Sequence, residues 1–231
     1  SLDGLVACPD VRGTVGRLLV GGGGGGGGGS AGGEADELAD ALSAMAIEGG
    51  VDIIQLREKN LSTSVFIKKA EALKQLTDQY KIPLIINDNL EVAKAVDAFG
   101  IHVGNNDIPP TQIKQQWDKH KAIGYSIEYL EQLKNEQTEV ANHLGISPVY
   151  STATKTDTVT EWGIEGIKKI RTLTTKPLIA IGRMDAGNAG EIIKAGADCI
   201  AVVSAICASK YPEKTAKNIK TQIHKHRNEN I

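Results

Sequence analysis

The sequence predicts a (β/α)8 barrel, a single α/β domain in which parallel strands alternate with helices. Short apolar runs alternate with helical segments from Val51 onward, at the spacing of βαβ units. Polar residues follow most of these runs, and the carboxyl ends of barrel strands are where such residues meet to form a site. The length of 231 residues is also close to the typical barrel length of about 250.

The predicted strands are near-continuous apolar runs, as expected of parallel strands that are buried on both faces. They are Val51–Leu56, Leu84–Ile86, Gly100–Val103, Ala122–Tyr125, Leu144–Val149, Leu178–Ile181 and Cys199–Val203. The predicted helices carry apolar residues at helical spacing, as Phe66, Ala70 and Leu73 do. They are Ala35–Ala46, Ser62–Tyr80, Leu90–Val96, Pro110–Trp117, Glu128–Lys134, Gly163–Thr172, Ala186–Ala195 and Glu213–His226.

A closed barrel needs one more strand, which must come from the irregular residues 1–33. This segment contains the glycine run Gly21–Gly29, which cannot pack and should behave as a flexible coil. Either Leu5–Cys8 or Val15–Val20 could supply the first strand, and we favour Leu5–Cys8. Residues 34–231 would then form the rest of the barrel and the catalytic domain.

Composition excludes several classes of function. A net charge of −2 and an aromatic content of 4% argue against a nucleic-acid surface. No run of 18 apolar residues is present, so we expect no membrane span. The odd count of three cysteines, with no Cys-x-x-Cys pair, favours free thiols in a reducing compartment and hence the cytoplasm.

Two cationic residues follow the predicted strand Val51–Leu56. Gln55, Arg57 and Lys59 are spaced by two, so their side chains should lie on one side of the chain. Burying cations without an anion is costly. Surface ion pairs with Glu58 or Asp88 are one explanation. A phosphate-rich substrate is the better partner, because Arg offers a planar donor fork and Lys a point charge.

Two carboxylates end consecutive predicted strands. Asp88, which follows Asn87, and Asp107 should therefore be neighbours at the barrel mouth. Nearby carboxylates repel unless they share a proton or a cation. Mg²⁺ would bridge them, since it binds one or two carboxylates together with substrate phosphates. Asp88 could instead, or in addition, cap the helix that begins at Leu90.

Further polar groups follow the remaining strands. They are Ser126, the loop residues Thr152, Thr154 and Lys155, and the strand ends Gly182, Val203 and Ser204. The last two barrel strands often bind a phosphate through backbone N–H groups. His102 lies between two apolar residues of a strand, which is typical of an inward-facing structural histidine rather than a metal ligand.

Seven segments, in their order and spacing, make the stretch from about Ala35 to Ile223 resemble the thiamine-phosphate synthase family. They are QLREK (Gln55–Lys59), IND (Ile86–Asp88), HVGNND (His102–Asp107), SPVYSTATK (Ser147–Lys155), AIG (Ala180–Gly182), AGAD (Ala195–Asp198) and VVSAI (Val202–Ile206). The resemblance implies that hydroxymethylpyrimidine diphosphate is joined to a thiazole phosphate, with release of pyrophosphate. It also implies Mg²⁺ as cofactor and small molecules as the only substrates.

The resemblance also implies roles for matching residues. Arg57, Lys59, Asn87 and Lys155 would contact pyrophosphate, Asp88 and Asp107 would bind Mg²⁺, and Gln55 would contact the pyrimidine. Ser126, Thr152 and Thr154 would lie near the pyrophosphate and thiazole, and Gly182, Val203 and Ser204 would hold the thiazole phosphate. Of these, Arg57, Lys59, Ser126 and Lys155 would act directly in catalysis.

Two positions near the site depart from the family pattern. Arg183 replaces a usual glycine, and Ser147 replaces another. A side chain at position 183 could obstruct the thiazole phosphate or bind it. Two alternatives stay open: a related thiazole tautomerase, an isomerase that shares the barrel, and a non-catalytic phosphate-binding barrel. The sequence also leaves the oligomeric state open, a homo-oligomer included.

Overall fold

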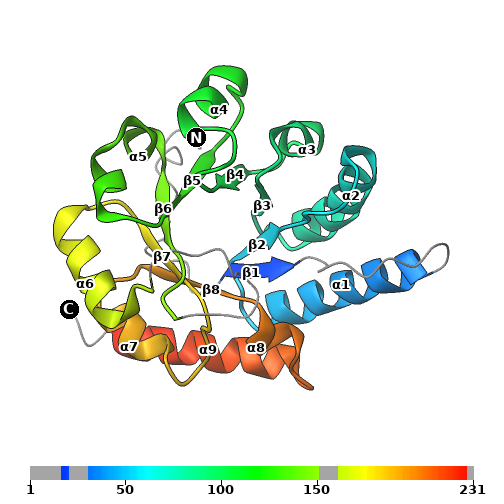
Figure 1. The fold of residues 1–231 in the computed structure, drawn as a ribbon. Coiled ribbons are helices and arrows are strands. Elements are labelled where there is room, and N and C mark those ends of the chain that lie inside the picture. The colour runs from blue at the N-terminus through cyan, green and yellow to red at the C-terminus, as the bar shows by residue number, and fades with distance from the viewer. Residues whose placement is uncertain (1–16, 21–30, 151–160, 228–231) are drawn as a thin grey trace.

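The computed structural model describes residues 17–20, 31–150 and 161–227. Its strands form a closed barrel in which each strand pairs in parallel with its neighbours in the sequence, and the first pairs with the last (Figure 1). The strands are β1 (Arg17–Val20), β2 (Ile53–Leu56), β3 (Leu84–Asn87), β4 (Gly100–Val103), β5 (Ala122–Ile127), β6 (His143–Ile146), β7 (Leu178–Ile181) and β8 (Cys199–Val202). The predicted (β/α)8 barrel is confirmed.

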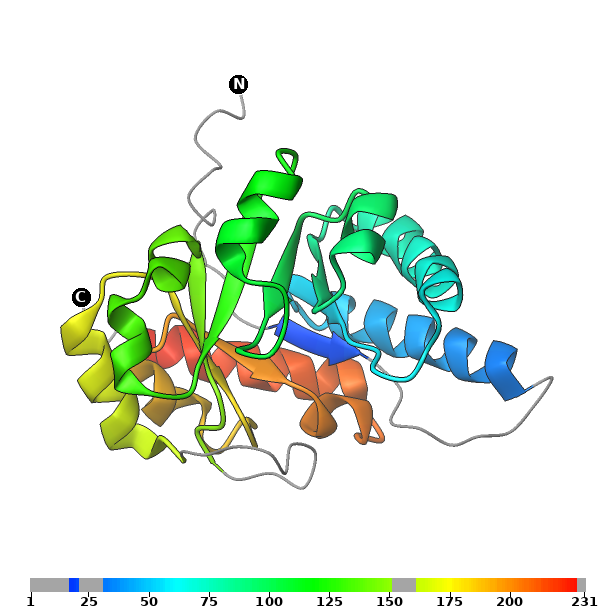
Figure 2. The ribbon, with the colours of Figure 1, turned by 45° about the horizontal axis from the view of Figure 1, so that its top comes forward.

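Helices surround the barrel on its outside, and α9 lies between α1 and α7 (Figure 2). They are α1 (Ala31–Glu48), α2 (Thr63–Gln79), α3 (Leu90–Ala95), α4 (Pro110–Gln116), α5 (Glu136–Val140), α6 (Gly163–Leu173), α7 (Ala189–Lys194), α8 (Ser204–Cys207) and α9 (Pro212–Arg227). A 3₁₀ helix, η1 (Leu130–Lys134), precedes α5. Among the described residues, no helix combines the length and the apolarity that crossing a membrane requires.

The preference for Leu5–Cys8 as the first strand was wrong. Arg17–Val20, within the alternative segment Val15–Val20, pairs with β2 on one side and β8 on the other. Leu5–Cys8 and the glycine run lie outside the described residues. The place between β2 and β8 can hold only one strand, and both candidates are short apolar runs, so local pattern could not choose between them.

Two helical details also differ from expectation. The segment predicted as the helix Glu128–Lys134 is instead the 3₁₀ helix η1, and α5 follows it. Asn135 lies between them and caps α5 by accepting a hydrogen bond from the Thr138 N–H at 2.8 Å. The short helix α8 was not predicted, because four residues are too few to show helical periodicity.

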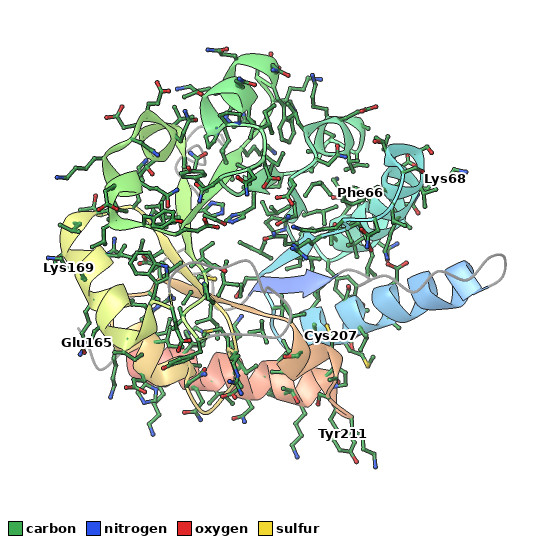
Figure 3. The ribbon with its side chains drawn as sticks, in the orientation of Figure 1. Phe66, Lys68, Glu165, Lys169, Cys207 and Tyr211 are labelled. Atoms are coloured by element: carbon green, nitrogen blue, oxygen red, sulfur yellow. The ribbon has the colours of Figure 1, made fainter. Side chains whose placement is uncertain are left out.

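Each strand separates two environments. Its outward residues, such as Ile54 and Ile86, pack against the helices in one large apolar core. Helix α2 shows the matching pattern: Phe66 points toward the strands and is buried, whereas Lys68 points away (Figure 3). Removing this apolar surface from water provides roughly 25 cal/mol per Å² and fixes the strands that carry the site.

The inward residues are apolar at one level and polar at the next. Ile53, Ile85 and Ala122 form an apolar cluster inside the barrel. Two residues further along their strands stand Gln55, Asn87 and the glycine at position 124. Because side chains alternate along a strand, residues two apart share a face. The interior of the barrel therefore has an apolar layer and, nearer the carboxyl ends of the strands, a polar layer.

Candidate active site

Gln55 and Asn87 begin the polar layer. Both are buried, and the Gln55 Nε2 donates to the Asn87 Oδ1 at 2.5 Å. The Gln55 Oε1 is the single buried side-chain nitrogen or oxygen without a hydrogen-bond partner among the described residues. Leaving a buried acceptor unpaired costs about 1–3 kcal/mol. This oxygen is therefore suited to accept a hydrogen bond from a bound molecule.

Asp88 follows Asn87 directly and belongs to neither the strand before it nor the helix after it. Its φ of +64° is in the left-handed region, and its N–H donates to the His102 carbonyl at 2.9 Å. The helix cap is Asn89, whose Oδ1 accepts from the Val92 N–H at 3.0 Å. The alternative that Asp88 caps this helix is thus wrong, because the neighbouring asparagine takes that role and leaves the Asp88 carboxylate available.

Asp107 lies next to Asp88, as the strand order predicted. The Asp107 Oδ2 accepts a hydrogen bond from the Gly104 N–H at 2.7 Å, which fixes the loop after β4. The same loop is held by Asn105, whose Oδ1 accepts from the Tyr125 hydroxyl at 2.6 Å. These contacts fix the second carboxylate in position at the barrel mouth.

Asp88 is largely buried and lies among charged groups of both signs. Burial raises the pKa of Asp88 from its ordinary value of 3.8 to about 7, and a hydrogen bond and a like charge from Asp107 add to this rise. The positive charges of Lys59 and Arg57 act in the opposite direction. Asp107, Lys59 and Arg57 therefore all lie close enough to influence the Asp88 carboxylate.

The donor set fits Mg²⁺. Two adjacent carboxylates supply hard oxygen ligands, and their mutual repulsion is relieved by a divalent cation. Within the described ranges no group of three or more His, Cys, Asp and Glu side chains could hold a metal. Mg²⁺ commonly completes its coordination with water and substrate phosphates, so two protein carboxylates suffice for a substrate-dependent site.

Glu58 pairs with Lys69 of α2 at 2.5 Å, and their side chains are 3% and 14% exposed. This ion pair anchors the loop after β2 to a helix. It places Arg57 and Lys59 on either side of an anchored residue, beside the carboxylate of Asp88. Both cations act on the Asp88 carboxylate, and their role in a shared site stays a prediction.

Ser126 lies inside the barrel and is 7% exposed. Its Oγ lies 3.0 Å from the His102 Nε2, and the His102 Nδ1 lies 3.4 Å from the Nε2 of His143. The expectation that His102 faces inward is confirmed. His143 was missed in the sequence; its place two residues before Gly145 on an alternating strand was the only signal for an inward side chain.

At the carboxyl ends of β7 and β8 the predicted site residues are Gly182, Val203 and Ser204, which carry no charged side chain. Gly182 has a φ of +116°, and a Cβ there would meet the Tyr150 carbonyl at 2.8 Å, so only glycine fits. Arg183 follows with a φ of +53° and an exposed side chain, and its carbonyl accepts from the Asn188 Nδ2 at 2.7 Å. Val203 and Ser204 are exposed where α8 begins.

Ser147 and Pro148 are joined by a cis peptide bond where β6 leaves the barrel. The Val149 N–H donates to the Ile181 carbonyl at 2.7 Å, which holds this segment against the end of β7. Thr152, Thr154 and Lys155 come next in the sequence and lie outside the described residues. Their assignment to the site stays a prediction.

Fold and site together point to a class: a (β/α)8 enzyme whose barrel carries, at one end, cations, paired carboxylates and backbone groups of the kind that suits phosphorylated substrates. A family model for thiamine monophosphate synthase matches residues 31–206. The chain belongs to this family, and the prediction of a thiamine-phosphate synthase is confirmed.

Individual relatives agree with this membership. The chain is 47% identical over 175 residues to the thiamine-phosphate synthase of Albidiferax ferrireducens, covering 76% of this chain and 80% of that protein. It is 39% identical over 168 residues to the Vibrio campbellii thiamine-phosphate synthase, covering 73% and 82%. The solved thiamine phosphate pyrophosphorylase of Pyrococcus furiosus superposes with a TM-score of 0.80 at 28% identity, covering 94% of this chain and 99% of that one.

Proposed function

We propose that this chain joins hydroxymethylpyrimidine diphosphate to a thiazole phosphate at the carboxyl end of its barrel, with Mg²⁺ held between Asp88 and Asp107. One observation supports the metal assignment most directly: Asp107, Arg57 and Lys59 all act electrostatically on the carboxylate of Asp88. A pair of carboxylates beside a pair of cations suits a metal–diphosphate unit, because each charge on the protein then meets an opposite charge on the ligand.

The reaction needs no nucleophile from the protein. The bond between the pyrimidine methylene carbon and the diphosphate oxygen breaks, and the electron pair leaves with pyrophosphate. The thiazole nitrogen then donates its lone pair to that carbon, forming the new C–N bond. The chain's residues contribute by orienting the two substrates and by stabilising the charge that develops on the leaving group. Bound Mg²⁺ supplies further positive charge to the diphosphate oxygens.

The described side chains divide this work by their chemistry. The unpaired Gln55 Oε1 is suited to accept a hydrogen bond from the pyrimidine amino group, and Asn87 fixes the orientation of that amide. Arg57 and Lys59 would bind the diphosphate and Ser126 would donate to it. Removing one such donor from an anionic transition state costs on the order of 100-fold or more in rate.

The second substrate would lie at the opposite side of the mouth. Gly182, Val203 and Ser204 would hold the thiazole phosphate through backbone N–H groups and the serine hydroxyl. Lys155, Thr152 and Thr154 would contact the pyrophosphate and thiazole from the loop before α6, in accord with the family pattern.

We also propose a cytoplasmic location. Cys199 is buried and Cys207 half-buried, and both are free thiols in the described part of the chain. Free thiols persist in a reducing compartment. The oligomeric state stays a prediction.

A direct assay tests the proposed function. The protein is incubated with both substrates, with Mg²⁺ or with EDTA, and thiamine phosphate and pyrophosphate are measured. We expect equal amounts of the two products, formed only with Mg²⁺. Metal-independent isomerisation of a thiazole substrate without condensation would instead indicate the tautomerase. Binding of thiazole phosphate with no turnover under any condition would indicate a non-catalytic barrel.

A further inference from the structure

Two buried histidines meet inside the barrel although their strands are not neighbours. The paired residues Asn87, His102, Gly124 and His143 form one row across β3, β4, β5 and β6. Partners in register share a face, so the whole row points inward. His102 and His143 therefore flank Gly124, with one strand between them.

The glycine makes their contact possible. A Cβ on Gly124 would overlap the rings of both histidines, and a Cβ on Gly145 would meet the His102 ring at 2.9 Å. With no side chain in the way, the rings stack with their centroids 5.6 Å apart and their planes at 26°. Glycine weakens a strand interior. The two imidazoles thus occupy space that these two glycines leave open.

Ser126 stands two residues beyond Gly124 on β5, one level closer to the mouth. A continuous chain of contacts runs from His143 through His102 to Ser126: the ring nitrogens lie 3.4 Å apart, and the second His102 nitrogen lies 3.0 Å from the Ser126 Oγ. The three side chains are 2%, 4% and 7% exposed, so bulk water does not compete for these contacts.

The position of one proton decides what Ser126 offers a ligand. A hydrogen bond between two ring nitrogens holds a single proton, and neutral imidazole has one donor and one acceptor nitrogen. If His143 donates to the His102 Nδ1, then the His102 Nε2 carries a proton and donates to the Ser126 Oγ. The hydroxyl hydrogen of Ser126 is then available to an anion. In the opposite arrangement the hydroxyl donates inward to His102 and presents only lone pairs.

We propose that His102 and His143 are positioning residues that hold the Ser126 hydroxyl as a donor toward the diphosphate. This inference rests on the proposed function, in which Ser126 contacts that group. An anion at the mouth favours the arrangement in which the hydroxyl hydrogen points toward it. The histidine pair thereby matches the polarity of a buried serine to the charge of the leaving group, without touching that group itself.

A double-mutant cycle tests the inference. We expect His143→Leu to lower kcat/KM for the pyrimidine diphosphate about tenfold, and His143→Gln, which keeps a neutral donor, to restore most of it. In a Ser126→Ala background the same His143→Leu change should lower kcat/KM less than twofold, because coupled residues are not additive. His226→Leu is the matched control: its ring Nδ1 contacts the Gln222 carbonyl on α9, and its loss should leave kcat/KM unchanged.

The possible results distinguish a failure of the histidine pair's role from a failure of the proposed function. Equal tenfold losses in both backgrounds would show that His143 does not act through Ser126. That result would overturn the proposed positioning role of the histidine pair, while the role of Ser126 would stand. Full activity in Ser126→Ala would overturn the role of Ser126 and, with it, the positioning role of the histidine pair. Mg²⁺-dependent formation of thiamine phosphate would still support the overall reaction.

A measurement on the unaltered protein covers the case in which a variant fails to fold. ¹⁵N NMR of histidine-labelled protein, loaded with Mg²⁺ and inorganic pyrophosphate, reports which nitrogen of His102 carries the proton. We expect the proton on Nε2. A proton on Nδ1 in that complex would overturn the proposal, since Ser126 would then donate inward.

Discussion

The two ends of this barrel solve the burial of polar groups in opposite ways. At the amino-terminal end, Arg171 of α6 donates to the Asp198 carboxylate at 2.8 Å and to the carbonyls of Gly196, Thr174 and Lys176. Asp198 accepts in turn from the Leu178 N–H at 2.9 Å. At the carboxyl-terminal end, Gln55 has an unpaired oxygen and two carboxylates lie side by side.

Left-handed residues show the same contrast. At the amino-terminal end, Gly50, Lys81 and Asp97 adopt positive φ where a helix ends and the chain turns into a strand. That conformation is an ordinary way to close a helix. At the other end, Asp88, Gly182 and Arg183 adopt it directly after a strand, beside the residues of the proposed site. One end therefore completes its own interactions, and the other keeps groups for a ligand to complete.

The largest expected effect belongs to the carboxylates. Asp88→Asn and Asp107→Asn should each lower kcat at saturating Mg²⁺ by roughly 100-fold or more, because each would remove a charged ligand of the proposed metal site. Product formation over a Mg²⁺ titration is the measurement. Asp78→Asn, an acid of α2 whose side chain is 61% exposed, is the control and should keep full activity. Full activity in both variants would exclude Asp88 and Asp107 as ligands of the metal.

Arg171 provides the opposite test. Arg171→Met should lower the free energy of unfolding by about 3 kcal/mol, because it leaves a largely buried carboxylate and several carbonyls without their donor. The kcat of the folded variant should stay unchanged. Urea unfolding and steady-state kinetics measure the two quantities, and Lys168→Met, which breaks an exposed pair with Glu165, should cost less than about 0.5 kcal/mol. A large fall in kcat would contradict the division between the two ends.

The metal-free protein should lose stability as pH rises. Folding raises the pKa of Asp88 from 3.8 to about 7, so the folded state holds this proton more tightly than the unfolded chain does. The stabilising contribution is complete below about pH 4 and is lost as pH rises through about 7. Thermal unfolding in EDTA across that range should show the decline. Asp88→Asn should flatten it, and an unchanged slope in that variant would assign the decline to other groups.

The smallest expected effect is at Arg183. Arg183→Gly should leave kcat intact and change mainly the KM for thiazole phosphate, because the side chain is exposed beside the proposed phosphate site. Glycine also adopts the observed φ of +53° without steric cost, which favours the folded state by up to about 1 kcal/mol. Initial rates over a range of thiazole phosphate are the measurement. A collapse of kcat would show a direct role for the guanidinium.

The sequence was most informative where a property repeats along the chain. Strand and helix periods placed β4 at Gly100–Val103 and β7 at Leu178–Ile181, as the structure has them. The same patterns placed Asp88 and Asp107 on consecutive strand ends, and the two do lie together. Local pattern could not separate Leu5–Cys8 from Arg17–Val20, because the choice depends on pairing with β8, far along the chain.

By itself the sequence determined the alternation of strands and helices over most of the chain from Val51 onward and the placement of Asp88 and Asp107 at consecutive strand ends, because both follow from short-range periodicity and the direction of parallel strands. Only the tertiary structure decided which segment closes the barrel, how burial and Asp107 set the pKa of Asp88, and that His143 reaches His102 over Gly124. These outcomes depend on neighbours brought together from distant parts of the chain, and periodicity carries no information about such contacts.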